Sequence, residues 1–249
     1  MCCKDRVAVV TGGMGGIGTA VCLRLAKEGA KVVATCHPSE TDRIDTWVGD
    51  MKTMGAEAAV IAGDVSTAEG GEVLMGQIVE KFGEVDILVN CAGITRDSTM
   101  KKMSVDQWDA VIDTNLSSAF YVTSPVWNSM VERGFGRVIN ISSVNGQRGQ
   151  FGQANYSAAK AGLHGFTMAL AYEGAAKGVT INTVSPGYIE TAMTAAMRDD
   201  VRDAIVSGIP MRRMGQPEEI AHAVAFLADE ASTYITGANL PVNGGLFIH

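Results

Sequence analysis

The sequence predicts an α/β fold built on one doubly wound parallel sheet of about seven strands, with helices on both faces. Two observations predict it. Short apolar runs rich in valine and isoleucine alternate with helix-like stretches along the chain, and the first run leads directly into an eight-residue loop that holds five glycines. Because the runs are apolar throughout, we expect their strands to be buried on both faces.

The expected strands and helices follow one another in regular order. The strands are the apolar runs at residues 7–10, 32–34, 58–61, 87–89, 138–141, 181–184 and, more weakly, 239–242. The helix signals between them are glycine C-caps, a capping box and a proline at a first helical position: Gly29, Gly83, Ser104 with Gln107, and Pro217. No linker, charge block or repeat divides the chain, so we expect a single domain over residues 1–249. The Met-rich and charged stretch at about 187–215 follows a strand, and we expect it to form a lid over a substrate.

Composition narrows the function classes. The chain has 249 residues, 47% of them hydrophobic, and a formal net charge of -7. This apolar content excludes a disordered chain, and the acidic balance argues against nucleic-acid binding by general basic attraction. No apolar run is long enough to span a membrane, and no signal peptide or lipidation motif stands at either end, so we expect a cytoplasmic protein. The cysteines are odd in number and lack metal-ligand spacing, which indicates a reducing compartment and no metal: Cys2, Cys3, Cys22, Cys36 and Cys91.

The glycine loop predicts a dinucleotide site. It reads Thr11-Gly-Gly-Met-Gly-Gly-Ile-Gly18, between the first strand and the first helix. Glycine tolerates a left-handed turn and lets backbone N–H groups approach a pyrophosphate at a helix N-terminus. We therefore expect the loop to contact the cofactor through Gly12, Met14, Gly16, Ile17 and Gly18.

The end of the second strand favours NADP(H) over NAD(H). An acidic residue there would bind the ribose 2′-hydroxyl of NAD, but this strand ends in Cys36-His37-Pro38. Arg43 follows shortly and is a candidate partner for a 2′-phosphate. A solvated helix arginine is the open alternative for Arg43.

A tyrosine and a lysine form the candidate acid–base pair. Tyr156 and Lys160 are four residues apart, which places them on one face of a helix. A phenol is a poor acid–base catalyst at neutral pH, and a nearby ammonium is expected to lower its pKa. Ser143, at the carboxyl end of a strand, and Asn115, in an apolar helical context, are expected to join them.

Taken together, these motifs resemble the short-chain dehydrogenase/reductase family. They are Thr11-Gly-x-x-x-Gly16-x-Gly18, Asn90-x-Ala-Gly93, Asn115, Ser143, Tyr156-x-x-x-Lys160 and Pro186-Gly187. They stand in the family's order over nearly the whole chain, which implies a Rossmann fold. Two positions depart from the family's habit: Cys91, where a second Asn is more usual, and Gly15, where many NADP-dependent members have a basic residue.

The resemblance implies a role for each matching residue. Tyr156 would be the general acid in reduction, Lys160 would lower its pKa and hold the nicotinamide ribose, and Ser143 would bind the substrate carbonyl. Asn115 would kink its helix and hold a water linking Lys160 to solvent. The remaining cofactor contacts would be Asp64 at the adenine, Asn90 and Gly93 on the adenosine side, and Ile189 and Thr191 at the nicotinamide amide after Pro186 and Gly187.

Within the family, the polar stretch 144–155 and other segments resemble the NADPH-dependent reductases of 3-oxoacyl thioesters. The resemblance implies reduction of acetoacetyl-CoA in polyhydroxybutyrate synthesis, substrate contacts from Gln150, Phe151 and Tyr188, and a homotetramer built through the long central helices. A loop residue that packs the lid is the alternative for Phe151. The alternative activities are reduction of a 3-oxoacyl group on acyl carrier protein and, from another class, a non-catalytic dinucleotide sensor. Because such ligands are anionic and the chain is acidic, local cations must attract them, and the candidates besides Arg43 are Arg96, Arg148 and Arg213.

Overall fold

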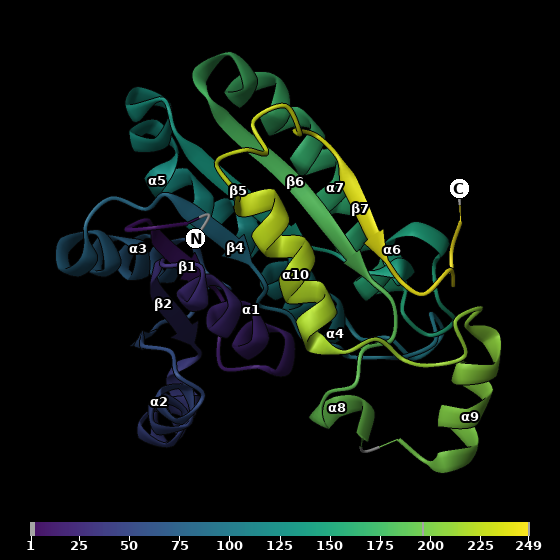
Figure 1. Ribbon diagram of the computed structural model, residues 1–249. Helices are drawn as coiled ribbons and strands as arrows, with labels where there is room; N and C mark the ends of the chain where they lie inside the picture. The colour runs from purple at the N-terminus through teal and green to yellow at the C-terminus, as the bar shows by residue number, and fades with distance from the viewer. Residues whose placement is uncertain (1–2, 196, 249) are drawn as a thin grey trace.

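The computed structural model describes residues 3–195 and 197–248, and its centre is a sheet of seven parallel strands (Figure 1). The strands are β1 (Val7–Val10), β2 (Lys31–Cys36), β3 (Ala58–Ala62), β4 (Ile87–Asn90), β5 (Gly136–Ile141), β6 (Val179–Pro186) and β7 (Asn239–Val242). Their order across the sheet is β3-β2-β1-β4-β5-β6-β7. All seven expected strands are present, and the strand order reverses between β1 and β4, next to the glycine loop. Open α/β sheets bind ligands at such a reversal.

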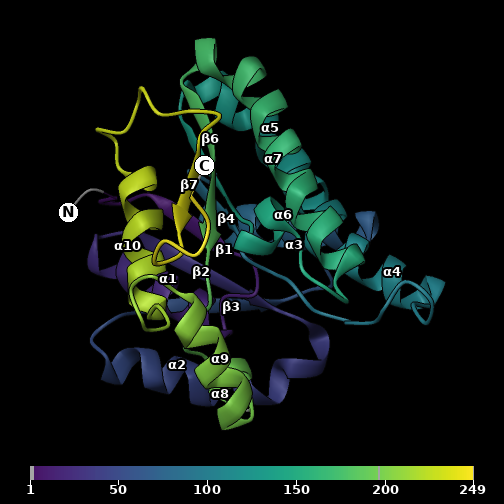
Figure 2. The same ribbon diagram turned by 90° about the vertical axis from the view of Figure 1, so that its right-hand side faces the viewer.

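Two helical layers cover the sheet (Figure 2). One face carries α1 (Gly16–Lys27), α2 (Ile44–Thr53) and α10 (Pro217–Ala228), and the other carries α3 (Ala68–Phe82), α5 (Ser118–Arg133) and α7 (Ala154–Gly174). Shorter elements complete the chain: η1 (Pro38–Arg43), α4 (Val105–Ile112), η2 (Asp113–Ser117), α6 (Val144–Arg148), η3 (Ala175–Lys177), α8 (Ala192–Ala195) and α9 (Asp199–Gly208). The fold is therefore the predicted Rossmann-like α/β fold.

The strands alternate between the two cores. Val9, Leu88 and Val138 lie side by side on β1, β4 and β5 and pack beneath α3 and α5. Their neighbours Val10 and Val89 point to the opposite core, beneath α1 and α10. Because both faces bury apolar side chains, the strands lack the apolar–polar alternation of a half-exposed sheet.

Helix ends follow the signals in the sequence. Ser104 and Gln107 form the expected capping box at the start of α4, and the Thr67 hydroxyl accepts a hydrogen bond from the Gly70 N–H at the start of α3. In contrast, α1 begins at Gly15 without a side-chain cap. The first N–H groups of a helix have no partner inside it, so this end of α1 can donate hydrogen bonds to an anion.

The carboxyl edge of the sheet gathers the predicted motifs. The glycine loop follows β1, Ser143 stands two residues after β5, and Pro186 ends β6. Beyond this edge, in the lower part of Figure 1, lie α8 and α9 from the 187–215 stretch. Within the described residues, no helix has the length and hydropathy needed to cross a bilayer, and no three His, Cys, Asp or Glu side chains cluster as metal ligands would.

Candidate active site

Tyr156 and Lys160 lie in the first turns of α7, and polar contacts fix this helix against the sheet. The Lys160 ammonium donates to the Ile141 carbonyl oxygen at 2.8 Å. One turn on, His164 lies against Ser142, and one turn further the buried Thr167 hydroxyl bonds with Asn140 and Thr183. We call Lys160, His164 and Thr167, with their partners on β5, β6 and the residue after β5, the α7 seam. Polar contacts of this kind impose one register, which apolar packing alone does less strictly.

The Lys160 ammonium is buried, with 4% of the residue exposed. Burial lowers the pKa of Lys160 to about 8, and the neighbouring Cys91 acts in the opposite direction. Burial raises the pKa of the Cys91 thiol to about 11, however, so at neutral pH this neighbour carries no charge. Lys160 therefore titrates much closer to neutral pH than an exposed lysine.

This burial predicts a pH-dependent stability. The pKa of Lys160 is about 8 in the folded protein and 10.5 ordinarily, so between these values the unfolded chain binds more protons. The free energy of unfolding should then rise with pH across this window, by up to about 1.4 kcal/mol per pH unit. The measurement is chemical denaturation of the cofactor-free protein and of Lys160→Met at several pH values from 7 to 11. If the free energy of unfolding varies with pH in the same way in both proteins, Lys160 is not the source of the dependence.

Ser143 connects β5 to α6 and caps that helix. Its hydroxyl oxygen accepts a hydrogen bond from the Asn145 N–H at 3.1 Å, which fixes the side chain at the carboxyl edge of the sheet. Burial raises the pKa of Tyr156, and a hydrogen bond with the Ser143 side chain opposes the rise. The two predicted catalytic side chains are thus in contact.

The net pKa shift of Tyr156 runs opposite to the effect expected of Lys160. Lys160 is expected to lower the pKa of Tyr156, but burial outweighs this effect and the net direction is upward. The cause is burial of the phenol, while the Lys160 ammonium lies 5.8 Å from the centre of the tyrosine ring. A raised pKa keeps the phenol protonated, which suits a proton donor.

Asn115 lies in a π-helical turn, η2, between α4 and α5. Its side-chain amide makes two hydrogen bonds with the backbone of Ile94: the Ile94 N–H donates to Oδ1 at 2.8 Å, and Nδ2 donates to the Ile94 carbonyl at 2.9 Å. The segment after β4 is thereby tied to η2. A Cβ on Gly93 would lie 3.5 Å from both the Asn115 oxygen and the Lys160 nitrogen, so the two meet at Gly93. Asn115 thus lies in a π-turn, a place where helices often kink.

The glycine loop has the close approaches that a dinucleotide cradle needs. Gly12 has a φ of +62°, and a Cβ there would lie 2.9 Å from the Ala92 backbone. A Cβ on Gly18 would lie 2.3 Å from the Gly12 carbonyl oxygen, and one on Gly16 would meet Thr191 at 2.8 Å. The loop and the start of the 187–215 stretch therefore face each other. Met14 is buried in the core and Ile17 packs against it, so neither side chain reaches into the cradle.

The residues at the adenosine end are engaged with their own neighbours. Arg43 ends η1, is more than half exposed, and pairs with Glu40 at 2.8 Å. Asp64 accepts hydrogen bonds from the Ser66 N–H and hydroxyl, which lower its carboxyl pKa. The buried Asn90 amide donates to Thr123 and Asn140. Because this side chain is turned into the protein, the backbone of Asn90 is what can face a cofactor.

The end of β6 leads into the 187–215 stretch. The Gly187 N–H donates to the Val242 carbonyl on β7, next to Pro186. Ile189 is buried, and its carbonyl accepts a hydrogen bond from the Thr194 hydroxyl, which also accepts one from the Thr191 N–H. These contacts hold the chain in place as it passes the glycine loop.

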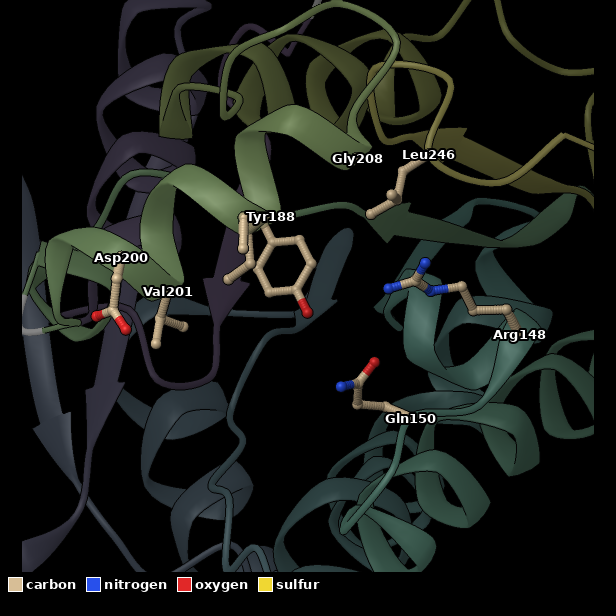
Figure 3. A pocket seen from close by; sticks show the side chains of 9 residues that line it. Arg148, Gln150, Tyr188, Asp200, Val201, Gly208 and Leu246 are labelled. Carbon is tan, nitrogen blue, oxygen red and sulfur yellow. The ribbon is translucent and has the colours of Figure 1, made fainter.

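A cavity of about 470 Å³ opens between α6 and α9 (Figure 3). Gln150 and Arg148 point into it from one side and Tyr188 from the other, while α9 contributes a largely apolar wall that includes Val201, Ala204 and Ile205. Phe151, expected among these contacts, is 86% exposed and lies outside the cavity lining. The cavity combines hydrogen-bonding groups with an apolar wall, as ligand sites do.

The three candidate cations differ in surroundings. Arg148 lines the cavity and, among the residues that the structure describes, has no acidic partner. Arg213 forms a two-pronged pair with Glu219, which neutralises it. Arg96 is exposed and donates to the carbonyl of Thr95.

Comparison with known proteins agrees with the fold and with the candidate active site. The profile of a family described as Enoyl-(Acyl carrier protein) reductase, a group of short-chain dehydrogenases, matches residues 12–247. The chain belongs to the short-chain dehydrogenase/reductase family. Members carry a nicotinamide cofactor, and the glycine cradle fits one.

Relatives extend the match over nearly the full length. The chain is 66% identical to an acetoacetyl-CoA reductase of Allochromatium vinosum, over 98% of this chain and 99% of the relative. It is 56% identical to an acetoacetyl-CoA reductase of Cupriavidus necator, over 97% and 98%. A 3-oxoacyl-[acyl-carrier-protein] reductase of Escherichia coli is 45% identical, over 98% of each chain. These relatives indicate an oxidoreductase that acts on a 3-oxoacyl thioester.

The structure adds residues that the sequence patterns missed. The wall from α9 has no motif, since Val201, Ala204 and Ile205 read as ordinary helix residues. His164, beside Ser142, could have been noticed from its position four residues after Lys160, because such residues share a helix face.

Proposed function

We propose that this protein reduces acetoacetyl-CoA to (R)-3-hydroxybutyryl-CoA with NADPH, in polyhydroxybutyrate biosynthesis. The observation that carries the proposal is the meeting of Asn115, Ser143, Tyr156 and Lys160 at one sheet edge in a chain 66% identical to an acetoacetyl-CoA reductase. The protein is one domain over residues 1–249, in which the 187–215 stretch acts as the lid.

The chain's own residues divide the chemistry. A bound nicotinamide cofactor supplies the hydride. Ser143 donates a hydrogen bond to the substrate carbonyl and stabilises the negative charge that develops on its oxygen. Tyr156, a phenol that is protonated at neutral pH and whose pKa burial raises further, gives its proton to that oxygen. The Lys160 ammonium stabilises the resulting phenolate, and Asn115 holds the segment around Gly93 that this ammonium approaches.

Cofactor contacts come from the glycine cradle and the surrounding strand ends. The cradle contributes Gly12, Gly16 and Gly18, with the backbone of Met14 and Ile17. The other contacts are Asp64, Asn90, Gly93, Lys160, Tyr156, Pro186, Gly187, Ile189 and Thr191. Gln150 and Tyr188, which line the cavity, contact the substrate, whereas Phe151 lies outside the lining and fits the alternative of a loop residue. Arg148, which has no acidic partner among the described residues, attracts the phosphates of the substrate.

We propose NADPH as the cofactor because β2 ends without a carboxylate and Arg43 stands nearby. Arg43→Ala should reduce the preference for NADPH over NADH by about tenfold, since a charge-assisted phosphate contact contributes about 1.5 kcal/mol. The measurement is kcat/KM for both cofactors, with Arg24→Ala, an arginine on α1 paired with Glu28, as the matched control. An unchanged preference in Arg43→Ala would remove this role.

We also propose a cytoplasmic homotetramer that assembles through the long central helices. Phe120 on α5 and Met168 and Tyr172 on α7 are large apolar side chains that are 57%, 52% and 91% exposed. Two neighbouring helices with such side chains offer a surface for a second copy. Sedimentation of the purified protein tests the oligomeric state.

Two alternative functions can be distinguished from the proposed one by experiment. A reductase for acyl-carrier-protein thioesters is favoured by the 45% identical relative, and it would use the same core chemistry. A non-catalytic dinucleotide sensor would bind NADPH without consuming it. Oxidation of NADPH on addition of acetoacetyl-CoA is the expected result, and binding without oxidation would overturn the proposed activity.

A further inference from the structure

The α7 seam contains a ring that the proposed mechanism leaves without a role. His164 is partly buried, and its Nε2 lies 2.9 Å from the Ser142 hydroxyl oxygen and 3.4 Å from that of Ser185. Ser142 immediately precedes Ser143, and His164 stands one turn after Lys160 on α7. The ring therefore links α7, which carries Tyr156 and Lys160, to the backbone segment that carries Ser143.

The surrounding hydrogen bonds determine which ring nitrogen carries a hydrogen. The Ser142 hydroxyl donates to the Lys160 carbonyl oxygen at 2.7 Å, and the Ser185 hydroxyl donates to Oδ1 of Asn239 at 2.7 Å. Each hydroxyl has a single hydrogen, which these bonds use. His164 Nε2 must therefore be the donor to Ser142, with Ser185 as a weaker second acceptor. Burial lowers the pKa of His164, which favours the neutral ring with its hydrogen on Nε2.

These bonds hold Lys160 from two sides. Its ammonium reaches the Ile141 carbonyl, and its own carbonyl accepts from Ser142, the residue that follows Ile141. A hydroxyl that rotates freely can donate to other acceptors. The Ser142 hydroxyl also accepts a hydrogen bond from the fixed His164 ring, which restricts this rotation. His164 thereby orients the hydroxyl that joins α7 to the end of β5.

We propose that His164 is a positioning residue, whose Nε2–H group fixes the Ser142 hydroxyl and so sets the register of Lys160 and Tyr156 against Ser143. This inference rests on the proposed function, because that function gives these three residues their roles. It predicts that loss of the donor moves the Lys160 ammonium away from the phenol. The phenolate then loses stabilisation, and the pKa of Tyr156 rises further.

The test compares three variants. His164→Leu removes the donor, His164→Gln keeps an N–H group at a similar reach, and Thr167→Val removes a seam hydrogen bond one turn farther from Lys160. Two quantities are measured: kcat with acetoacetyl-CoA, and the ultraviolet titration of Tyr156, obtained by subtracting the spectrum of the same protein with Tyr156→Phe. The titration needs no substrate, so it decides the inference even if the thioester is not the true substrate.

In His164→Leu, we expect kcat to fall about tenfold and the Tyr156 titration midpoint to rise by about one pH unit. His164→Gln should restore both, and Thr167→Val should lower Tm without moving the midpoint. If His164→Leu does not fold, His164→Asn, whose amide is too short to reach Ser142, replaces it. The inference is overturned if the midpoint is unchanged in the donor-free variant, if His164→Gln fails to restore it, or if Thr167→Val moves it equally.

Discussion

Tyr156→Phe should reduce turnover by about a hundredfold to ten-thousandfold while NADPH binding stays near that of the unchanged protein. The substitution removes only the hydroxyl, which is the group that gives a proton to the substrate oxygen, and general acids contribute about 10²–10⁴ in rate. The ring remains and keeps its packing on α7. The measurements are single-turnover NADPH oxidation and a titration of NADPH binding.

Tyr188→Phe is the matched control for this variant. Its phenol belongs to the cavity lining rather than to the acid–base group, so its removal should affect KM more than kcat. Near-normal turnover in Tyr156→Phe would contradict the mechanism. Loss of NADPH binding in the same variant would instead show that the Tyr156 hydroxyl is essential for holding the cofactor, beyond its contact there.

Ser143→Ala should lower kcat by about a hundredfold to a thousandfold, because a lost oxyanion donor costs about 2.7–4 kcal/mol of transition-state stabilisation. It should also reduce stability by about 1 kcal/mol, since the hydroxyl caps α6 through the Asn145 N–H. Ser143→Thr keeps both the hydroxyl and a capping oxygen. Ser143→Thr should therefore recover both the activity and the stability that Ser143→Ala loses.

The readouts for Ser143 are kcat and the free energy of unfolding for each variant. We expect Ser143→Thr to retain most of the stability and far more activity than Ser143→Ala. If Ser143→Ala is destabilised yet turns over normally, Ser143 acts only as a helix cap.

The sequence could predict the sheet and most of the candidate site because these features have local causes. Apolar runs such as 87–89 form strands wherever they are buried on both faces, and the glycine loop is limited to backbone conformations that glycine allows. The meeting of Ser143 with Tyr156 also follows from topology, since the carboxyl ends of parallel strands share an edge.

Other features depend on tertiary burial and could not be read from a pattern. The net direction of the Tyr156 pKa reflects the partial burial of this residue in the folded chain. Asn90 has the expected position, but its side chain bonds to Thr123 on α5, far away in the sequence. The sequence predicts a lid at 187–215, but which α9 residues form the cavity wall depends on how that stretch folds over the sheet edge.

We expect this site to serve a CoA thioester. The most direct test of this expectation is kcat/KM for NADPH-dependent reduction of acetoacetyl-CoA and of the same acyl group on acyl carrier protein, measured side by side. The two substrates share the pantetheine arm. Beyond that arm, the CoA thioester has a phosphorylated adenosine, whereas the carrier-protein thioester has a protein surface. We predict a higher kcat/KM for acetoacetyl-CoA; a strong preference for the carrier-protein thioester would contradict the account.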